Sequence, residues 1–185
     1  MAKCKTYING HFFEYDCEEV QSGSRTHGVQ YRVVQDLPFE PVDVHFFKQH
    51  IRVDFEMDDN LLESYLKSAR QELEQYSQLS FGEKTIRLLA LKLPNNYRLM
   101  YGPVATIVDD QFELFGDIVK NAGGKEVTFQ FTTGWEGGLP EPIKIAICQY
   151  AAGLYANREN ILTAQSNWID QAKMTMDRYK NVFVV

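Results

Sequence analysis

The sequence predicts a mainly α fold, namely a helical bundle with a small antiparallel β insertion, an N-terminal arm and a C-terminal helical tail. Apolar side chains recur at intervals of three and four along residues 58–78 and 142–154, which indicates two core helices. Between these segments, short runs rich in β-branched and aromatic residues predict strands. With 185 residues, of which 44% are hydrophobic, the chain has room for one domain with additions.

Three parts are expected along the chain. Residues 1–36 form an arm, because the stretch 22–28 has loop composition and no apolar period, although residues 31–34 predict a short strand. Residues 37–160 form the core, with the β insertion at about residues 85–132. Residues 161–185 form a C-terminal amphipathic helix and tail.

A short helix is predicted first in the core. Asp43 is placed to cap it, and Val44, Phe47 and Ile51 follow at helical spacing. A long helix follows, capped by Asp58 or Asp59 and extending to about residue 78. Its apolar stripe consists of Leu62, Leu66, Ala69, Leu73 and Tyr76.

Strands are predicted at residues 85–93, 104–108, 111–115 and 126–132, with a hairpin turn at residues 121–124. In the first of them, Ile86, Leu88 and Ala90 share one face because side chains alternate along a strand. These runs are short, so the sequence predicts a small sheet between the helices.

A second core helix begins near Pro142, after a tight loop at residues 134–140. Its apolar face contains Ile143, Ile147, Tyr150 and Leu154. Gly153 costs such a helix about 1 kcal/mol relative to alanine, which indicates either a close approach by another backbone or simple tolerance. A final apolar stripe from residue 164 to residue 183 packs on the chain's own core or lies in a partner's groove.

Composition and motifs argue against an enzyme and a metal site. The sequence contains no glycine-rich phosphate loop, no His-Glu-x-x-His motif and no Gly-x-Ser-x-Gly elbow, so neither a catalytic residue nor a cofactor is expected. Cys4, His11, Cys17 and His27 have the side chains of zinc ligands, but their spacing matches no common zinc module. The net charge of -6 opposes general DNA binding.

The sequence also predicts the compartment in which the chain is made. No apolar run approaches the roughly 18 residues that span a bilayer, and the N-terminus lacks the apolar stretch of a signal peptide. The three cysteines are an odd number spread over the chain, which suits a reducing compartment. A cytoplasmic origin is therefore expected, without a membrane partner.

Six short segments occur in a recognisable order: Glu40-Pro-Val42, His50-Ile-Arg-Val-Asp54, Asp58-Asp-Asn-Leu-Leu62, Thr132-Thr-Gly-Trp135, Pro140-Glu-Pro-Ile-Lys-Ile-Ala146 and Asn157-Arg-Glu159. In order and spacing they resemble the head-tail connector proteins of tailed phages, also called adaptor or head-completion proteins. The resemblance covers about residues 40–160. It implies a structural virion protein, a helical bundle with a β insertion, that is assembled in the host cytoplasm.

The resemblance further implies a homo-oligomeric ring, commonly of twelve copies, between the portal protein and a stopper or tail protein. DNA passes through the ring without specific binding, and acidic side chains facing the channel keep it from sticking. We assign this role to Asp54, Glu56, Asp58 and Asp59. Ring packing is assigned to Ala152, Gly153, Ala156 and Arg158. Portal binding is assigned to the C-terminal stripe and its apolar end, namely Trp168, Ala172, Met176, Tyr179, Phe183, Val184 and Val185.

Two further functions remain as alternatives. One is a stopper or tail-completion protein, but these generally resemble β barrels, and the helical periodicity here is stronger than the strand signal. The other is a host-side helical module that binds a ligand or regulates a partner, for which a stable monomer without affinity for portal is expected.

Overall fold

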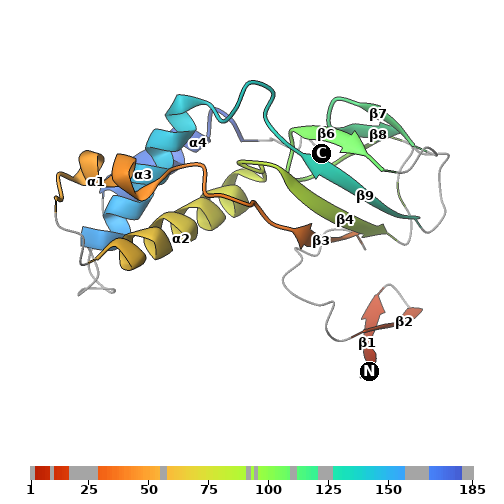
Figure 1. Ribbon diagram of the computed structural model, residues 1–185. Coiled ribbons are helices and arrows are strands. Elements are labelled where there is room, and N and C mark those ends of the chain that lie inside the picture. The colour runs from red at the N-terminus through yellow and green to blue at the C-terminus, as the bar shows by residue number, and fades with distance from the viewer. Residues whose placement is uncertain are drawn as a thin grey trace. The chain divides into compact units, whose positions relative to one another are not determined.

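The computed structural model describes residues 3–8, 11–16, 29–54, 58–90, 93, 96–108, 112–120, 127–156 and 167–180. These residues form four helices and nine strands (Figure 1). The chain divides into two compact units. The β unit comprises Met1–Asp36, Glu83–Leu99 and Val104–Thr133, and the helical unit comprises Leu37–Gly82, Met100–Pro103 and Gly134–Val185.

The prediction of a mainly α fold is wrong, because strands form a compact unit of their own rather than a small insertion. Seven strands of the β unit make two antiparallel sheets, and a hairpin makes a third. The four-stranded sheet contains β3 (Val29–Gln35), β4 (Lys84–Ala90), β9 (Val127–Thr133) and β6 (Val104–Ile107), in this order. The three-stranded sheet contains β5 (Asn96–Arg98), β8 (Ile118–Lys120) and β7 (Glu113–Phe115), and the hairpin pairs β1 (Lys3–Ile8) with β2 (His11–Asp16).

Strand β4 is one of the two central strands of the four-stranded sheet, and its buried side chains stabilise that sheet. It alternates strictly between buried and half-buried residues, with Ile86, Leu88 and Ala90 on the buried face as predicted. Ile86 is paired with Phe131 and Leu88 with Phe129, so large apolar side chains meet across the ladder. The short strand predicted at residues 31–34 is confirmed as part of β3, which pairs with β4.

The predicted strands of the insertion are confirmed in part. Strand β6 lies within the predicted range 104–108 and β7 within 111–115, while β4 ends at Ala90 rather than at residue 93. Strands β5 and β8, of three residues each, were not predicted. The hairpin turn predicted at residues 121–124 lies outside the described residues.

The helical unit contains α1 (Val44–Ile51), α2 (Asp59–Ser77), α3 (Glu141–Ala156) and α4 (Asn167–Met176). The predicted cap of α1 is confirmed, since the Asp43 carboxylate accepts a hydrogen bond of 2.7 Å from the backbone N–H of Phe46. At α2 the predicted capping bond is absent: Asp58 is the N-cap residue, but its side chain accepts no cap hydrogen bond. Helix α4 ends at Met176, before the end of the apolar stripe.

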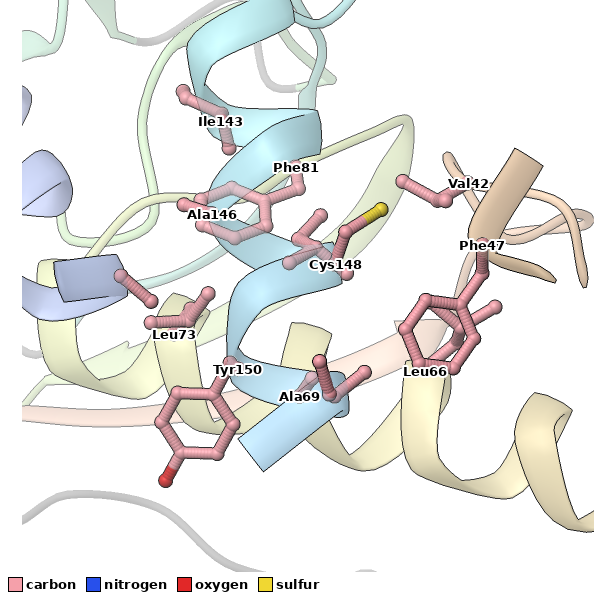
Figure 2. Close-up of a cluster of buried hydrophobic side chains, with 14 of the residues drawn as sticks. Val42, Phe47, Leu66, Ala69, Leu73, Phe81, Ile143, Ala146, Cys148 and Tyr150 are labelled. Atoms are coloured by element: carbon pink, nitrogen blue, oxygen red, sulfur yellow. The ribbon is translucent and has the colours of Figure 1, made fainter. Parts of the chain in front are cut away.

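The core of the helical unit lies between α2 and α3, with α1 and α4 packed around them (Figure 2). Leu66 and Leu73 of α2 and Ile143 and Ile147 of α3 are at most 2% exposed, which confirms both predicted stripes. Removing one such leucine typically costs about 2–5 kcal/mol, so these contacts dominate the stability of this unit. Within the described residues, none of the helices has the length and apolarity needed to cross a bilayer.

Candidate interaction surfaces

The predicted acidic surface surrounds the first turn of α2. Asp54 is exposed, Asp58 and Asp59 are half-buried, and Glu56 lies outside the described residues. One of these charges is paired, because Lys48 Nζ of α1 lies 2.9 Å from Asp59 Oδ1. The described acids lie close together along the chain. Because of its ion pair with Lys48, Asp59 also joins α1 to α2, in addition to its predicted place on the channel-facing surface.

A buried arginine fixes the segment that leads into α1. Arg70 of α2 is 1% exposed, and its guanidinium meets Glu40 at two points and Glu74 at a third. The other oxygen of Glu74 accepts a hydrogen bond of 2.8 Å from the backbone N–H of Phe81. A buried charge is stable only when it is paired and hydrogen-bonded, and this network meets that condition. It holds three separate segments of the helical unit together, and sequence periodicity gave no sign of it.

The end of α4 is held against α2 by Tyr76. Its hydroxyl donates a hydrogen bond of 2.7 Å to Asp177, and Lys180 Nζ lies 4.1 Å from the centre of its ring. The hydrogen bond to Asp177 is the main cause that raises the pKa of Tyr76, because the carboxylate favours the protonated phenol. These contacts thus hold residues 177–180 against α2.

The residues assigned to portal binding have different environments. Ala172 and Met176 are fully buried in the chain's own core, and Tyr179 packs against that core. Trp168 is 44% exposed and touches the His50 ring edge-on, with 5.9 Å between ring centroids. The remaining three, Phe183, Val184 and Val185, lie outside the described residues.

The residues assigned to ring packing lie in or after the last turn of α3. Ala152 and Gly153 are buried within the helical unit, whereas Ala156 is exposed. Arg158 lies outside the described residues. Of the described members of this group, Ala156 is therefore the one with a solvent-accessible side chain.

The described residues show no candidate metal centre. They contain no group of three or more His, Cys, Asp or Glu side chains arranged to hold a metal ion. The Cys148 thiol is buried in the helical core, and this burial raises its pKa to about 12. Since the thiolate is the nucleophilic form, Cys148 behaves as an apolar core residue.

Sequence reasoning missed an exposed apolar pair at the turn of the β7–β8 hairpin. Phe115 and Ile118 face each other across the turn and are 75% and 38% exposed. The available signal was the dipeptide Gly116-Asp117 between them, since glycine followed by aspartate is typical of a two-residue hairpin turn.

Three solved structures have a similar fold. One is described as the neck of an empty gene transfer agent (GTA) particle computed with C6 symmetry, with 20% identity and a TM-score of 0.69. The second is described as the virion of a native GTA particle, with 22% identity and a TM-score of 0.67. The third, the neck of a native GTA particle computed with C12 symmetry, has 20% identity and a TM-score of 0.64. Each match covers 84% of this chain and 97% of the other chain.

The sequence comparisons differ in outcome. Curated proteins include no significant match to this chain. The family model described as "Phage gp6-like head-tail connector protein" matches residues 42–180, which is about three quarters of the chain.

Proposed function

Because this chain belongs to the family of phage gp6-like head-tail connector proteins, we propose that it is a structural adaptor in the neck of a virion. In this proposal, copies of the chain form a ring around the DNA channel, between the portal protein and a stopper or tail protein. The observation that carries the proposal is the family match across residues 42–180, which includes all four helices and both larger sheets except β3. The chain acts without catalysis or a cofactor, and assembly takes place in the host cytoplasm.

The ring contains twelve copies in this proposal. Two of the structures with a similar fold are necks computed with C6 and with C12 symmetry. A ring of twelve identical copies satisfies both symmetries. Closed rings require a heterologous contact, in which one surface of each copy meets a different surface of the next.

The acidic first turn of α2 faces the channel in this proposal. Exposed Asp54 and half-buried Asp58 supply negative charge, while Asp59 is partly neutralised by Lys48. Like charges raise the energy of contact with the phosphate backbone, so DNA passes without adhering. The effect extends over about 8 Å at physiological salt.

Portal binding is proposed for the C-terminal end of the chain. Ala172 and Met176 serve the chain's own core, so the candidates for direct contact are exposed Trp168 and the terminal residues Phe183, Val184 and Val185. Tyr76 contacts Lys180, the residue that precedes that terminal segment in the sequence. A short apolar segment is suited to a partner's groove. For ring packing, exposed Ala156 is the candidate among the described residues, and Arg158 remains proposed from the sequence.

Truncation after Lys180 tests the portal contact without damaging the core. This variant keeps Ala172, Met176 and the contacts of Tyr76, so the helical unit stays folded. We expect it to lose co-migration with portal particles in size-exclusion chromatography, while its circular dichroism spectrum stays unchanged. The matched control is Met174→Ser, which alters an α4 side chain that is 69% exposed. Undiminished portal binding by the truncated chain would exclude residues 181–185 from the contact.

A further inference from the structure

Strand β6 leaves one edge of the four-stranded sheet open for pairing. It is the last strand in the order of that sheet, with β9 on its inner side. The backbone N–H of Val108 donates a hydrogen bond of 2.9 Å to the carbonyl oxygen of Gln130 in β9. Backbone groups alternate between the two sides of a strand, so the N–H and C=O of Ile107 point outward. Among the described residues, no strand pairs with them there.

This edge carries none of the residues that normally keep an edge strand from pairing with another chain. Natural edge strands are often blunted by charged side chains, above all lysine, or by proline. Residues 104–108 contain neither, and Val108 is 68% exposed. The bulge against β9 lies between Val104 and Thr106, so the rest of the strand keeps a regular register. The opposite edge strand of the sheet, β3, carries the charged residue Arg32.

The β1–β2 hairpin is the part of the chain that needs a further strand. It forms a two-stranded sheet of its own and belongs to neither of the larger sheets. An isolated hairpin is marginally stable at best in water, and a third strand is the usual remedy. The family match begins at residue 42, so the hairpin lies outside the part of the chain that the family model describes. Its partner is therefore to be sought in an open sheet edge.

The two strands of the hairpin differ in composition. Strand β1 contains two lysines, which discourage pairing along an outer edge. Strand β2 contains no lysine, and three of its six residues are aromatic. Strand β6 consists of three β-branched residues and one alanine. Aromatic and β-branched residues make favourable cross-strand pairs, so β2 is the strand suited to β6, with β1 on the outside.

We propose that the β1–β2 hairpin of one copy adds to the β6 edge of the next copy, with β2 paired to β6. The resulting sheet has six strands, four from one copy and two from its neighbour. Twelve residues, 17–28, connect β2 to β3, and an extended chain of that length spans up to about 40 Å, more than the roughly 30 Å of a small domain. Donor and acceptor are different surfaces, as a closed ring requires. The proposal rests on the ring proposed above and adds a contact that builds it.

Photo-cross-linking tests this contact in the full chain. Benzoylphenylalanine replaces Ala105, an exposed residue of β6. Chains with the probe are mixed with heavy-isotope chains that lack it, alone and with portal particles, and are irradiated. Mass spectrometry identifies the linked residues, and the isotope separates links between chains from links within one chain. We expect links to residues 11–16 of a heavy chain. The matched control places the probe at Val33, an exposed residue of β3, and should give no such links.

Four results overturn the inference. Links to residues 11–16 within one chain only would show that the hairpin completes its own sheet. Links from Val33 instead of Ala105 would show that the hairpin uses the β3 edge. A ring of full mass in which the probe at residue 105 never reaches the hairpin would leave the proposed adaptor function intact. Absence of any ring, alone or with portal, would overturn both the inference and the proposed function.

A second measurement removes the backbone donor itself. Ile107→Pro deletes the outward N–H of β6, and proline is tolerated in an edge strand where that group faces solvent. Ile107→Ala is the matched control, because it removes the side chain but keeps the N–H. The proline variant should need a concentration about tenfold or more higher to form rings, alone or on portal particles.

A change in the hairpin tests the same contact without touching β6. Phe13→Lys introduces a charge into β2, which lies outside the larger sheets, and should raise the concentration needed for ring formation by a similar factor. The inference therefore stays testable even if the Ile107→Pro chain fails to fold. Equal effects of the two Ile107 variants, or normal ring formation by Phe13→Lys, would overturn it.

Discussion

Arg70 and Glu40 form a two-point ion pair across 30 residues of sequence, with 2.7 Å between Nε and Oε2 and 3.1 Å between Nη2 and Oε1. Glu40 lies four residues before α1, and Arg70 lies inside α2, so the pair fixes the approach to the first helix. Arg70 also binds Glu74 at 2.9 Å. Planar two-point pairing of this kind gives both energy and a defined geometry.

Replacing Arg70 with alanine should therefore destabilise the protein strongly. Two carboxylates lose the guanidinium, and breaking a buried ion pair such as that of Arg70 and Glu74 typically costs about 3–5 kcal/mol. The free energy of unfolding in urea measures the effect. Lys67→Ala, an exposed change one turn earlier in α2, serves as the control and should stay within about 0.5 kcal/mol of the original protein. Similar values for the two variants would contradict a structural role for Arg70.

The Cys148 thiol should be unreactive in the folded protein. Burial raises its pKa from 9.0 to about 12, so the reactive thiolate is scarce at pH 8 and the sulfur is shielded. With Cys4 and Cys17 replaced by serine, an aromatic disulfide reagent should release no colour until urea unfolds the chain. Rapid colour release at pH 8 without urea would show that the core opens readily.

The same shift predicts a loss of stability at alkaline pH. The folded-state pKa is higher than the unfolded-state value, so the contribution is fully present below about pH 9 and is lost as pH rises toward 12. Cys148→Ala removes this contribution but keeps the tyrosines. Between pH 9 and 12, its free energy of unfolding should fall less steeply than that of the original protein. Parallel curves for the two proteins would contradict the raised pKa.

Removing the Tyr76 hydroxyl should loosen the end of the described chain. Tyr76→Phe loses the hydrogen bond to Asp177 but keeps a ring beneath Lys180, whereas Tyr76→Ala loses both contacts. Amide hydrogen exchange at residues 177–180 should accelerate in the first variant and more in the second. Exchange in the buried part of α4 should change little in Tyr76→Phe. Unchanged exchange at residues 177–180 in both variants would contradict the anchoring role.

Reversing the charge of Asp54 should slow DNA ejection. Asp54 is exposed at the proposed channel surface, and a lysine at this position attracts passing phosphate groups. Ejection from purified virions, followed by dye binding to released DNA, measures the rate in particles with Asp54→Lys, Asp54→Asn or the original residue. Asp170→Lys is the control, because Asp170 is also exposed but lies on α4. Normal ejection by Asp54→Lys particles would place Asp54 away from the channel.

The helices were predictable because each has a long apolar stripe. Leu62, Leu66 and Leu73 are buried as their spacing indicates, and Asp43 caps α1 as expected. The fold class was mistaken because the extent of the β unit depends on pairing between distant segments. Strand β3 was predicted, but its place beside β4 follows from tertiary contacts that no local period reveals. The division into arm, core and tail stays a prediction.

The candidate surfaces were predictable to a smaller degree. A stripe such as Ala172 and Met176 looks the same whether it packs on its own core or on a partner, and here it packs on its own core. The Arg70 network and the exposed hairpin depend on which side chains the fold brings together. The resemblance to connector proteins gave the family correctly. The order and spacing of short motifs can be read directly from a sequence, whereas the shape of a surface cannot.

The mass of the protein in solution, alone and mixed with portal particles of the same phage, tests the central claim most directly. Multi-angle light scattering during size-exclusion chromatography gives both values. The account predicts a species of about twelve times the 21.4 kDa chain, either alone or co-migrating with portal. A protein that stays monomeric in both conditions and ignores the portal would contradict it.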